Sequence, residues 1–178
     1  MIETERLILR GWRDADGDAF VAVTNTSEVM AYLGGVEDPA LLKSSVLSQQ
    51  AVQAELGYCF WVVERRSDRT LMGFCGLKPG PAGTPLFGEV EIGWRLGAQF
   101  WGHGYAREAA QASLDWAWSN LSVATVAAMT VPGNERSWGL MERIGMARVP
   151  DGDFDHPAFP DGHPLRRHIL YRIGRPVQ

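Results

Sequence analysis

The length, composition and charge of the chain narrow its class before any motif is considered. The chain has 178 residues, of which 46% are hydrophobic and 21% charged. This suits one domain with a full core over residues 1–178 and excludes a disordered chain. The formal net charge is −4 and the pI is near 5.6, whereas general nucleic-acid binding needs a basic face. No nucleic-acid partner is therefore expected.

The sequence also bears on the cellular compartment. It contains no apolar run long enough for a membrane span, and its acidic start lacks the apolar region of a signal peptide. The two cysteines, Cys59 and Cys75, each lie in an apolar strand pattern. Reduced buried thiols are the favoured interpretation, with a disulfide as the alternative. We expect a cytoplasmic protein with no membrane partner.

Hydrophobic periodicity and turn residues predict the first half of the fold. The predicted elements, in order, are a strand over 6–12, a helix from Asp14, a helix over 39–56, strands over 58–64 and 70–77, and a loop over 78–85. Asp14 suits an N-cap, and Pro39 suits a first helical position. Ser67 and Asp68 suit a hairpin turn between the two later strands.

The second half continues with alternating strands and helices. The predicted elements are a strand over 88–96, a helix over 103–119, a strand over 124–131, a helix that Asn134 caps and Gly145 ends, a loop over 150–164, and a strand over 165–173. Small residues at three- and four-residue spacing on helix 103–119 allow close packing on a sheet. Strand, helix and strand in this order predict a right-handed parallel crossover. The chain is therefore interpreted as one α/β (or α+β) domain.

Two glycines, Gly102 and Gly104, lie where a predicted strand turns into a predicted helix. Backbone amides at such a turn can converge on an anion, and glycine lets a ligand approach because it has no Cβ. We therefore expect a phosphate-bearing ligand here. A dinucleotide-binding turn would need glycine where the chain has Arg107, and no Gly-Lys-Ser/Thr of a Walker loop is present.

Four motifs together resemble the GNAT acetyltransferase superfamily, and within it the RimJ/RimL-like group that acetylates amines. They are Thr4-Glu5-Arg6-Leu7-Ile8-Leu9-Arg10, Glu91-Ile92-Gly93-Trp94, Gln99-Phe100-Trp101-Gly102-His103-Gly104-Tyr105-Ala106, and Asn134-Glu135-Arg136-Ser137 with Leu140 to Met146. The resemblance covers nearly the whole chain. It implies a mixed central sheet of about six to seven strands, with a splayed parallel pair and helices on both faces.

The resemblance also implies acetyl-CoA as acetyl donor and a primary amine as acceptor, with no metal. Its implied diphosphate site is the turn: Gln99, Gly102, His103, Gly104, Tyr105 and Ala106. Its implied pantetheine site is the backbone of the preceding strand, with two residues of a later helix: Ile92, Gly93, Trp94, Arg95, Leu96, Asn134 and Ser137.

Transfer to an amine needs a base, and the predicted central strand offers two carboxylates. Glu89 and Glu91 share one face because side chains alternate along a strand. We favour Glu91, which is closer to the expected thioester, acting directly or through a water. Glu89 as base, or a merely solvated or salt-bridged carboxylate, stays open.

The acid is less well defined. Many members of the family have a tyrosine where this chain has Met141, which cannot donate a proton. Ser137 is a candidate to relay a proton or to position the sulfur, with an ordinary helix serine as the alternative. An oxyanion donor is expected from a backbone N–H near Trp94.

The loop over 150–164 is expected to cover the acceptor end. Its carboxylates, Asp151, Asp153, Asp155 and Asp161, would attract an amine, or would form an ordinary surface loop. A metal site is a minor alternative. Trp12, Trp61 and Trp94 would line the acceptor pocket or pack in the core.

The leading hypothesis is an acetyl-CoA-dependent N-acetyltransferase acting on a protein N-terminus or a small amine. The alternative is a catalytically weak module of the same fold that binds acyl-CoA for sensing. A homodimer is left open, and the sequence does not name the acceptor.

Overall fold

The computed structural model describes residues 1–177. Its strands are β1 (Ile2–Glu3), β2 (Leu7–Arg10), β3 (Phe60–Arg65), β4 (Leu71–Pro79), β5 (Val90–Leu96), β6 (Thr125–Thr130), β7 (Ala147–Arg148), β8 (Phe154–Asp155) and β9 (Arg167–Gly174). Its helices are α1 (Asp16–Thr24), α2 (Ser27–Met30), α3 (Pro39–Leu56), α4 (Tyr105–Asn120) and α5 (Glu135–Arg143), with a 3-10 turn at Ala98–Phe100.

The strands form one mixed sheet in the order β1-β2-β3-β4-β5-β6-β9-β7, with β8 added to β9. All neighbours are antiparallel except β5 and β6, which are parallel and joined through α4. The predicted mixed α+β architecture is confirmed. The described sheet has nine strands, where six to seven were expected, because β1, β7 and β8 have two residues each and leave no periodic pattern.

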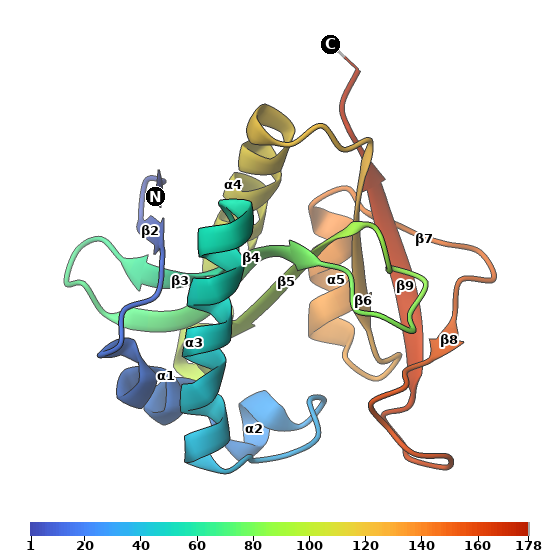
Figure 1. Cartoon of the computed structure of the whole chain (residues 1–178), viewed down its shortest axis with the longest axis horizontal. Helices are drawn as coiled ribbons and strands as arrows, with labels where there is room; N and C mark the ends of the chain where they lie inside the picture. The colour runs from blue at the N-terminus through green and yellow to red at the C-terminus, as the bar shows by residue number, and fades with distance from the viewer. Residues whose placement is uncertain (178) are drawn as a thin grey trace.

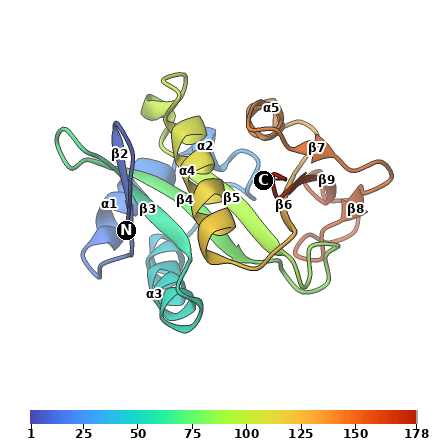
Figure 2. The same ribbon diagram turned by 90° about the horizontal axis from the view of Figure 1, so that it is seen from above.

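Helices cover both faces of the sheet. Helix α3 lies below β3, β4 and β5 and α4 lies above them in the view from above (Figure 2), and α3 packs on α1. Helix α5 packs beside β6 and contacts α4. Strands β6, β7, β8 and β9 lie to the right of β2, β3, β4 and β5 in Figure 1. The molecule therefore has two halves that meet where β5 lies next to β6.

The core is a continuous apolar cluster between the sheet and its helices. The small residues predicted on the helix over 103–119 do face the sheet: Ala109, Ala110, Ser113, Leu114 and Ala117 are fully buried. Small side chains let α4 approach β4 and β5 closely, which brings the start of α4 near the end of β5. Cys59 and Cys75 are buried and unpaired, and burial raises the pKa of each thiol to about 12.

The start of the first helix differs from the prediction. Helix α1 begins at Asp16, and the predicted cap, Asp14, lies outside it. The Asp16 carboxylate instead accepts a hydrogen bond from the Arg13 amide at 2.7 Å and a bidentate pair from Arg10 at 2.7 and 2.9 Å. The buried arginine on β2 therefore decides where this helix begins, which local capping preference could not show.

The remaining boundaries follow local chemistry more closely. Asp38 caps α3 with Pro39 in its first turn, Gly57 ends it at φ 80°, and Gly145 follows α5 at φ 88°. Helix α2 has four residues and was not predicted. Within residues 1–177, no helix has the length and apolar character to cross a membrane.

Candidate active site

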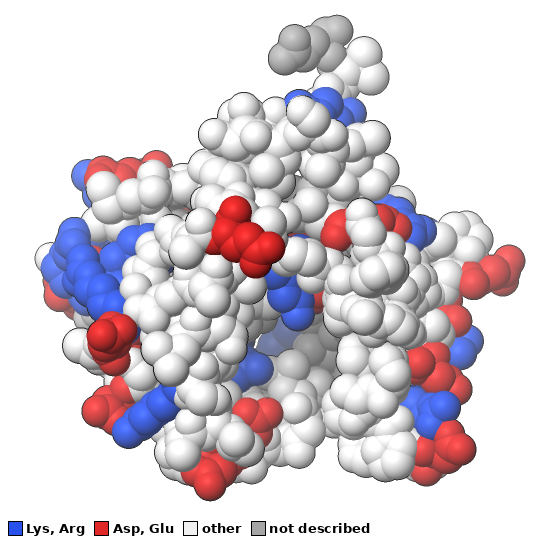
Figure 3. Space-filling model, in the orientation of Figure 1, with Lys and Arg blue, Asp and Glu red and all other residues white. Residues whose placement is uncertain are grey.

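A cavity of about 900 Å³ opens where the two halves of the molecule meet. The space-filling view shows a deep hollow there, with basic side chains visible inside it and carboxylates on the rim (Figure 3). The walls come from β4, β5, β6, the start of α4, α5, the α2 segment and residues near β8 and β9. This volume is large enough for an extended ligand and a second molecule.

The glycine turn forms one end of the cavity. Gly102 and Gly104 have φ of 77° and 80°, the left-handed region that glycine adopts without strain. Gly104 is the N-cap of α4, and no side chain caps this helix. The first amides of α4 are therefore free to bind an anion, and the helix dipole favours negative charge there. Both glycines, Tyr105 and Ala106 line the cavity.

Residues from the N-terminal strand region hold this turn in place. Arg6 donates to the His103 carbonyl oxygen at 3.0 Å and to Glu108 in the first turn of α4 at 2.6 Å. Glu108 also accepts from the Thr4 hydroxyl and from the Arg6 amide. Because the Glu108 carboxylate is hydrogen-bonded to these donors, it does not compete with a ligand for the amides at the start of α4.

The parallel strands separate beside the turn. Strands β5 and β6 pair only through Val90 with Val126 and Glu91 with Ala127. From Ile92 onward, the edge of β5 that faces β6 has no strand partner. The residues predicted to contact pantetheine line the cavity at this separation: Ile92, Gly93, Trp94, Arg95 and Leu96. The splayed pair predicted from the sequence is therefore present.

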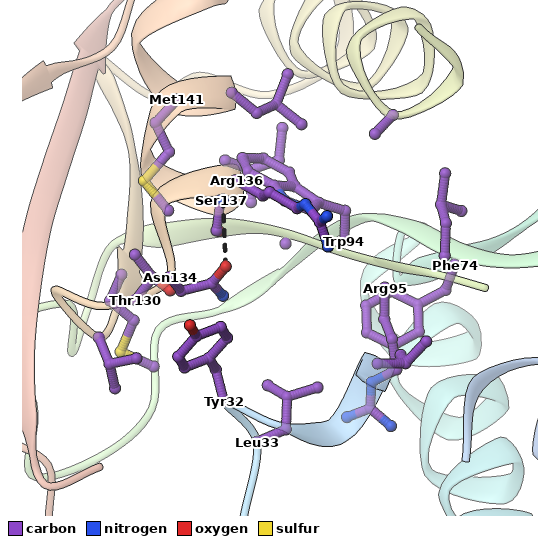
Figure 4. Close-up of a pocket in the computed structure, with 18 of the residues that line it drawn as sticks. Tyr32, Leu33, Phe74, Trp94, Arg95, Thr130, Asn134, Arg136, Ser137 and Met141 are labelled. Carbon is purple, nitrogen blue, oxygen red and sulfur yellow. Dashed lines mark hydrogen bonds between the residues drawn. The ribbon is translucent and has the colours of Figure 1, made fainter. Parts of the chain in front are cut away.

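Helix α5 contributes the opposite wall. Asn134 caps it by accepting from the Ser137 amide through Oδ1 at 3.3 Å, as Figure 4 shows. Its side-chain amide nitrogen is then left to face the cavity. Ser137 and Met141 line the same wall, and Met141 is 2% exposed. The structure thus places Asn134 and Ser137, the two residues predicted from this helix, in the cavity wall opposite the separated strands.

Glu91 lies in the cavity wall and is 7% exposed. Lys78, its register partner on β4, places Nζ 3.4 Å from Glu91 Oε2, an ion pair without hydrogen-bond geometry. Burial raises the pKa of Glu91, and the charge of Lys78 lowers it by less. A buried carboxylate with a raised pKa in a cavity wall is suited to accept a proton.

Three predicted residues do not line the cavity. Glu89 precedes β5, and its carboxylate accepts three hydrogen bonds from Arg172 of β9 at 2.6, 2.9 and 3.2 Å. Gln99 is exposed in the 3-10 turn. The exposed His103 ring lies against Tyr105, although its backbone belongs to the turn.

The acidic loop differs from its predicted role. Asp153 pairs with Arg148, Asp161 pairs with Arg166, and Asp155 pairs with Arg166 and Arg167. These three carboxylates are engaged by arginines, which favours the alternative of an ordinary surface loop for them. The loop and β9 instead supply aromatic and imidazole side chains to the cavity: His156, Phe159 and His168. Of the three tryptophans considered, Trp94 lines the cavity, while Trp12 and Trp61 are buried in the core.

Lys78 and Arg95 are charged side chains of the wall whose charge was not assigned a role from the sequence. Lys78 lies opposite Glu91 and 5.1 Å from the centre of the Phe60 ring. Arg95 was predicted only as a backbone contact, but its guanidinium lies 5.5 Å from the centre of the Phe74 ring in the cavity wall. Strand alternation places Glu91, Gly93 and Arg95 on one face, a signal present in the sequence.

The acetyltransferase (GNAT) domain family model matches residues 6–147. The chain is similar to the uncharacterized N-acetyltransferase YnaD of Bacillus subtilis, with 32% identity over 97% of this chain and 95% of the relative. It is similar in structure to a GNAT-family acetyltransferase from Bacillus anthracis, with a TM-score of 0.79, 27% identity and 98% coverage of both chains.

A third similarity concerns the fold alone. The spermidine N-acetyltransferase of Vibrio cholerae, solved with CoA and spermine, has a TM-score of 0.73 and 18% identity, with 97% of each chain covered. The family match spans most of the chain, and enzymes of this family use acetyl-CoA. The free amides at the start of α4 and the separated strands β5 and β6 are features that such a ligand needs. The chain therefore belongs to the GNAT family of N-acetyltransferases.

Proposed function

We propose that this chain transfers the acetyl group of acetyl-CoA to a primary amine, on a small molecule or a protein N-terminus, by direct attack of the amine on the thioester. One observation carries the proposal. A single cavity contains the uncapped start of α4, the separated strands β5 and β6, and the buried carboxylate of Glu91. The donor site and a base therefore share one space.

The donor half binds through main-chain groups. The amides of residues 102–106 bind the diphosphate, so this site needs no charged side chain in the turn. The unpaired backbone of β5 from Ile92 to Leu96 binds the pantetheine amides, and the Asn134 side-chain amide binds from the other wall. The bound thioester supplies an activated acetyl group at the point where β5 and β6 separate.

Glu91 serves as the base in this scheme. An amine attacks only as the neutral form, so its ammonium first loses a proton to Glu91 or to a water held by Glu91. The carbon–nitrogen bond forms, the carbon–sulfur bond breaks, and the thiolate leaves with its electron pair. A backbone N–H of β5 near Trp94 stabilises the charge that develops on the carbonyl oxygen. The nitrogen, cationic after attack, loses its second proton, and Ser137 relays a proton to the departing sulfur, so the products are the amide and free CoA thiol.

One observation favours the alternative of a weakly catalytic acyl-CoA-binding module. Met141 lines the cavity, and a thioether cannot donate a proton to the leaving thiolate. A thiolate whose conjugate thiol has a pKa near 8.5 can leave without such help, because it is a much weaker base than an alkoxide or an amide anion. The alternative therefore predicts acetyl-CoA binding with no turnover above solvent hydrolysis.

Release of free CoA thiol from acetyl-CoA tests the proposal. We expect release that depends on an added amine, measured with a panel of α-amino acids, amino-acid amides, peptides and polyamines. Binding is measured separately as the rise in melting temperature with CoA, since a ligand at 100 times its Kd adds about 2.7 kcal/mol of stability. Binding without amine-dependent release would favour the binding module, and the absence of both would reject the donor site.

A further inference from the structure

Arg95 is a cation in the cavity wall that lacks an anionic partner. It lies on β5, and its side chain projects beside Phe74 toward the segment that carries Leu33 (Figure 4). Its Nε atom is buried without a hydrogen-bond partner, and it forms no ion pair with any residue from 1 to 177. Burial lowers its pKa, and the charge of Glu37 opposes this from beyond ion-pair distance.

The absence of a counter-charge for Arg95 lowers the stability of the folded protein. A guanidinium keeps its proton in proteins, so burial cannot be relieved by neutralisation. Arg95 is half-buried, and its buried Nε lacks a hydrogen-bond acceptor, which costs free energy in the folded state. The faces of Phe74 and Phe20, 5.5 and 5.9 Å from the guanidinium carbon, offset only part of this cost.

The other basic residues of the cavity have either an anionic neighbour or contact with solvent. Lys78 lies 3.4 Å from Glu91, and Arg136 lies 3.7 Å from Glu28 and over the Trp101 ring. Arg107 and Arg143 are exposed to solvent. Among the basic residues of the described cavity wall, Arg95 is thus the one with a buried nitrogen that lacks a hydrogen-bond partner and with no ion pair.

The position of Arg95 relative to Glu91 indicates which kind of ligand supplies the missing negative charge. Both side chains project from the same face of β5, four residues apart, or about 13 Å between Cα atoms at the usual strand rise. The stacked rings of Phe60 and Phe74, 4.9 Å apart, form an apolar floor between them. Gly93 leaves room for this floor, because a Cβ there would come within 2.8 Å of the Phe60 ring.

From this arrangement we infer that the acceptor is an amine that also carries a carboxylate, an amino acid or a close analogue, whose carboxylate pairs with Arg95. In an α-amino acid the amine and the carboxylate share one carbon, so with the carboxylate at Arg95 the amine gives its proton to Glu91 through a water. The apolar side chain rests on Phe60 and Phe74. The inference rests on the proposed acetyl transfer and narrows its acceptor. A polyamine would place a second cation near an unpaired arginine and is therefore a poor acceptor here.

Matched acceptors test the inference. Leucine and phenylalanine are compared with leucinamide and phenylalaninamide, which keep the amine and the side chain but lose the carboxylate; spermidine is the cationic control. We expect kcat/KM of the full-length enzyme to favour the acids by roughly 10- to 100-fold, the usual strength of a charge-assisted hydrogen bond. Arg95→Met should abolish this preference, and Arg95→Lys should retain part of it.

Arg13→Met is the charge-matched control, since Arg13 is exposed and does not line the cavity. It should keep the preference of the unmodified enzyme. Equal kcat/KM for acids and amides, or an equal loss of both in Arg95→Met, would overturn the inference. An unchanged KM for acetyl-CoA in Arg95→Met is expected, because the donor half is held by backbone groups.

A binding measurement separates this inference from the proposed function. Calorimetry with CoA-saturated protein should show that N-acetyl-leucine binds more tightly than N-acetyl-leucinamide, and that Arg95→Met removes the difference. Failure of every amine to release thiol, with this binding difference intact, would reject the transfer reaction but leave the carboxylate site standing. No difference in binding would reject the carboxylate site even if amines are acetylated.

Discussion

The two carboxylates at the start of β5 are chemically equivalent in the sequence and different in the structure. Glu89 is neutralised by the bidentate guanidinium of Arg172, whereas Glu91 is buried in the cavity wall and pairs only with Lys78, at 3.4 Å and without a hydrogen bond. Both oxygens of the Glu89 carboxylate are engaged by Arg172, and Glu89 does not line the cavity. This difference is why we assign proton transfer to Glu91.

Glu91→Gln should lower kcat by about 100- to 10,000-fold, the range of general-base catalysis, while the Kd for CoA stays unchanged. Its melting temperature at neutral pH should not fall, because burial raises the pKa of Glu91 and the ionised form is costly in the folded state. For the same reason, the rate of the unmodified enzyme should rise with pH as Glu91 loses its proton. Equal activity in Glu91→Gln would move the base to Glu89 or to solvent.

At the scale of elements, the turn between β5 and α4 combines a local backbone requirement with distant support. The positive φ of Gly102 and Gly104 is a property of the turn itself. The contacts that hold the turn come from Arg6 and Thr4, about a hundred residues earlier, through Glu108. The turn is therefore formed by local sequence and held rigid by tertiary structure, and rigidity is what a diphosphate site made of amides requires.

Gly102→Ala tests the turn, and the chain offers a close control in Gly162→Ala. Both glycines have φ of 77°, and a Cβ on either would meet no atom within 4 Å. Both substitutions should therefore cost about 1 kcal/mol of stability through backbone strain alone. Only Gly102→Ala should raise the Kd for CoA, by roughly tenfold, as measured by calorimetry. A similar change in Kd for both variants would place the diphosphate elsewhere.

At the scale of the whole molecule, the cavity joins two halves that both supply ionisable side chains to its wall. The half with β8 and β9 brings His156 and His168 to the cavity, with ring centres 4.8 Å apart. Burial lowers the pKa of both, and for His156 the charges of His168 and Lys78 lower it further. The folded state therefore favours the neutral form of both histidines.

Acidification should weaken the fold through these histidines. A histidine whose folded pKa lies below its unfolded pKa contributes stability that is present above the unfolded pKa, near 6.5, and is lost as pH falls toward the folded pKa. Urea unfolding at pH 7.5 and 5.5 should show a decrease in the free energy of unfolding that is smaller in His168→Gln. The same decrease in both proteins would show that His168 does not carry the effect.

Much of the fold and of the donor site was predictable because it depends on residues close together in sequence. Pro39 and Asp38 begin α3, Asn134 begins α5, and Gly145 ends it, since helix ends are decided by the few residues that satisfy their terminal groups. The glycine turn and the strand–helix–strand crossover follow from the same local rules. The family resemblance agreed with these features and with the observed architecture.

Only the tertiary structure decided which charged groups of the cavity are free to act. Arg172 reaches Glu89 from 83 residues away, Arg10 moves the start of α1 by engaging Asp16, and the arginines near β8 neutralise the acidic loop. The sequence determined that Glu91 and Arg95 share a strand face, because alternation is a property of the strand itself. Whether each finds a partner depends on which side chains packing brings within a few ångströms, and no local pattern contains that information.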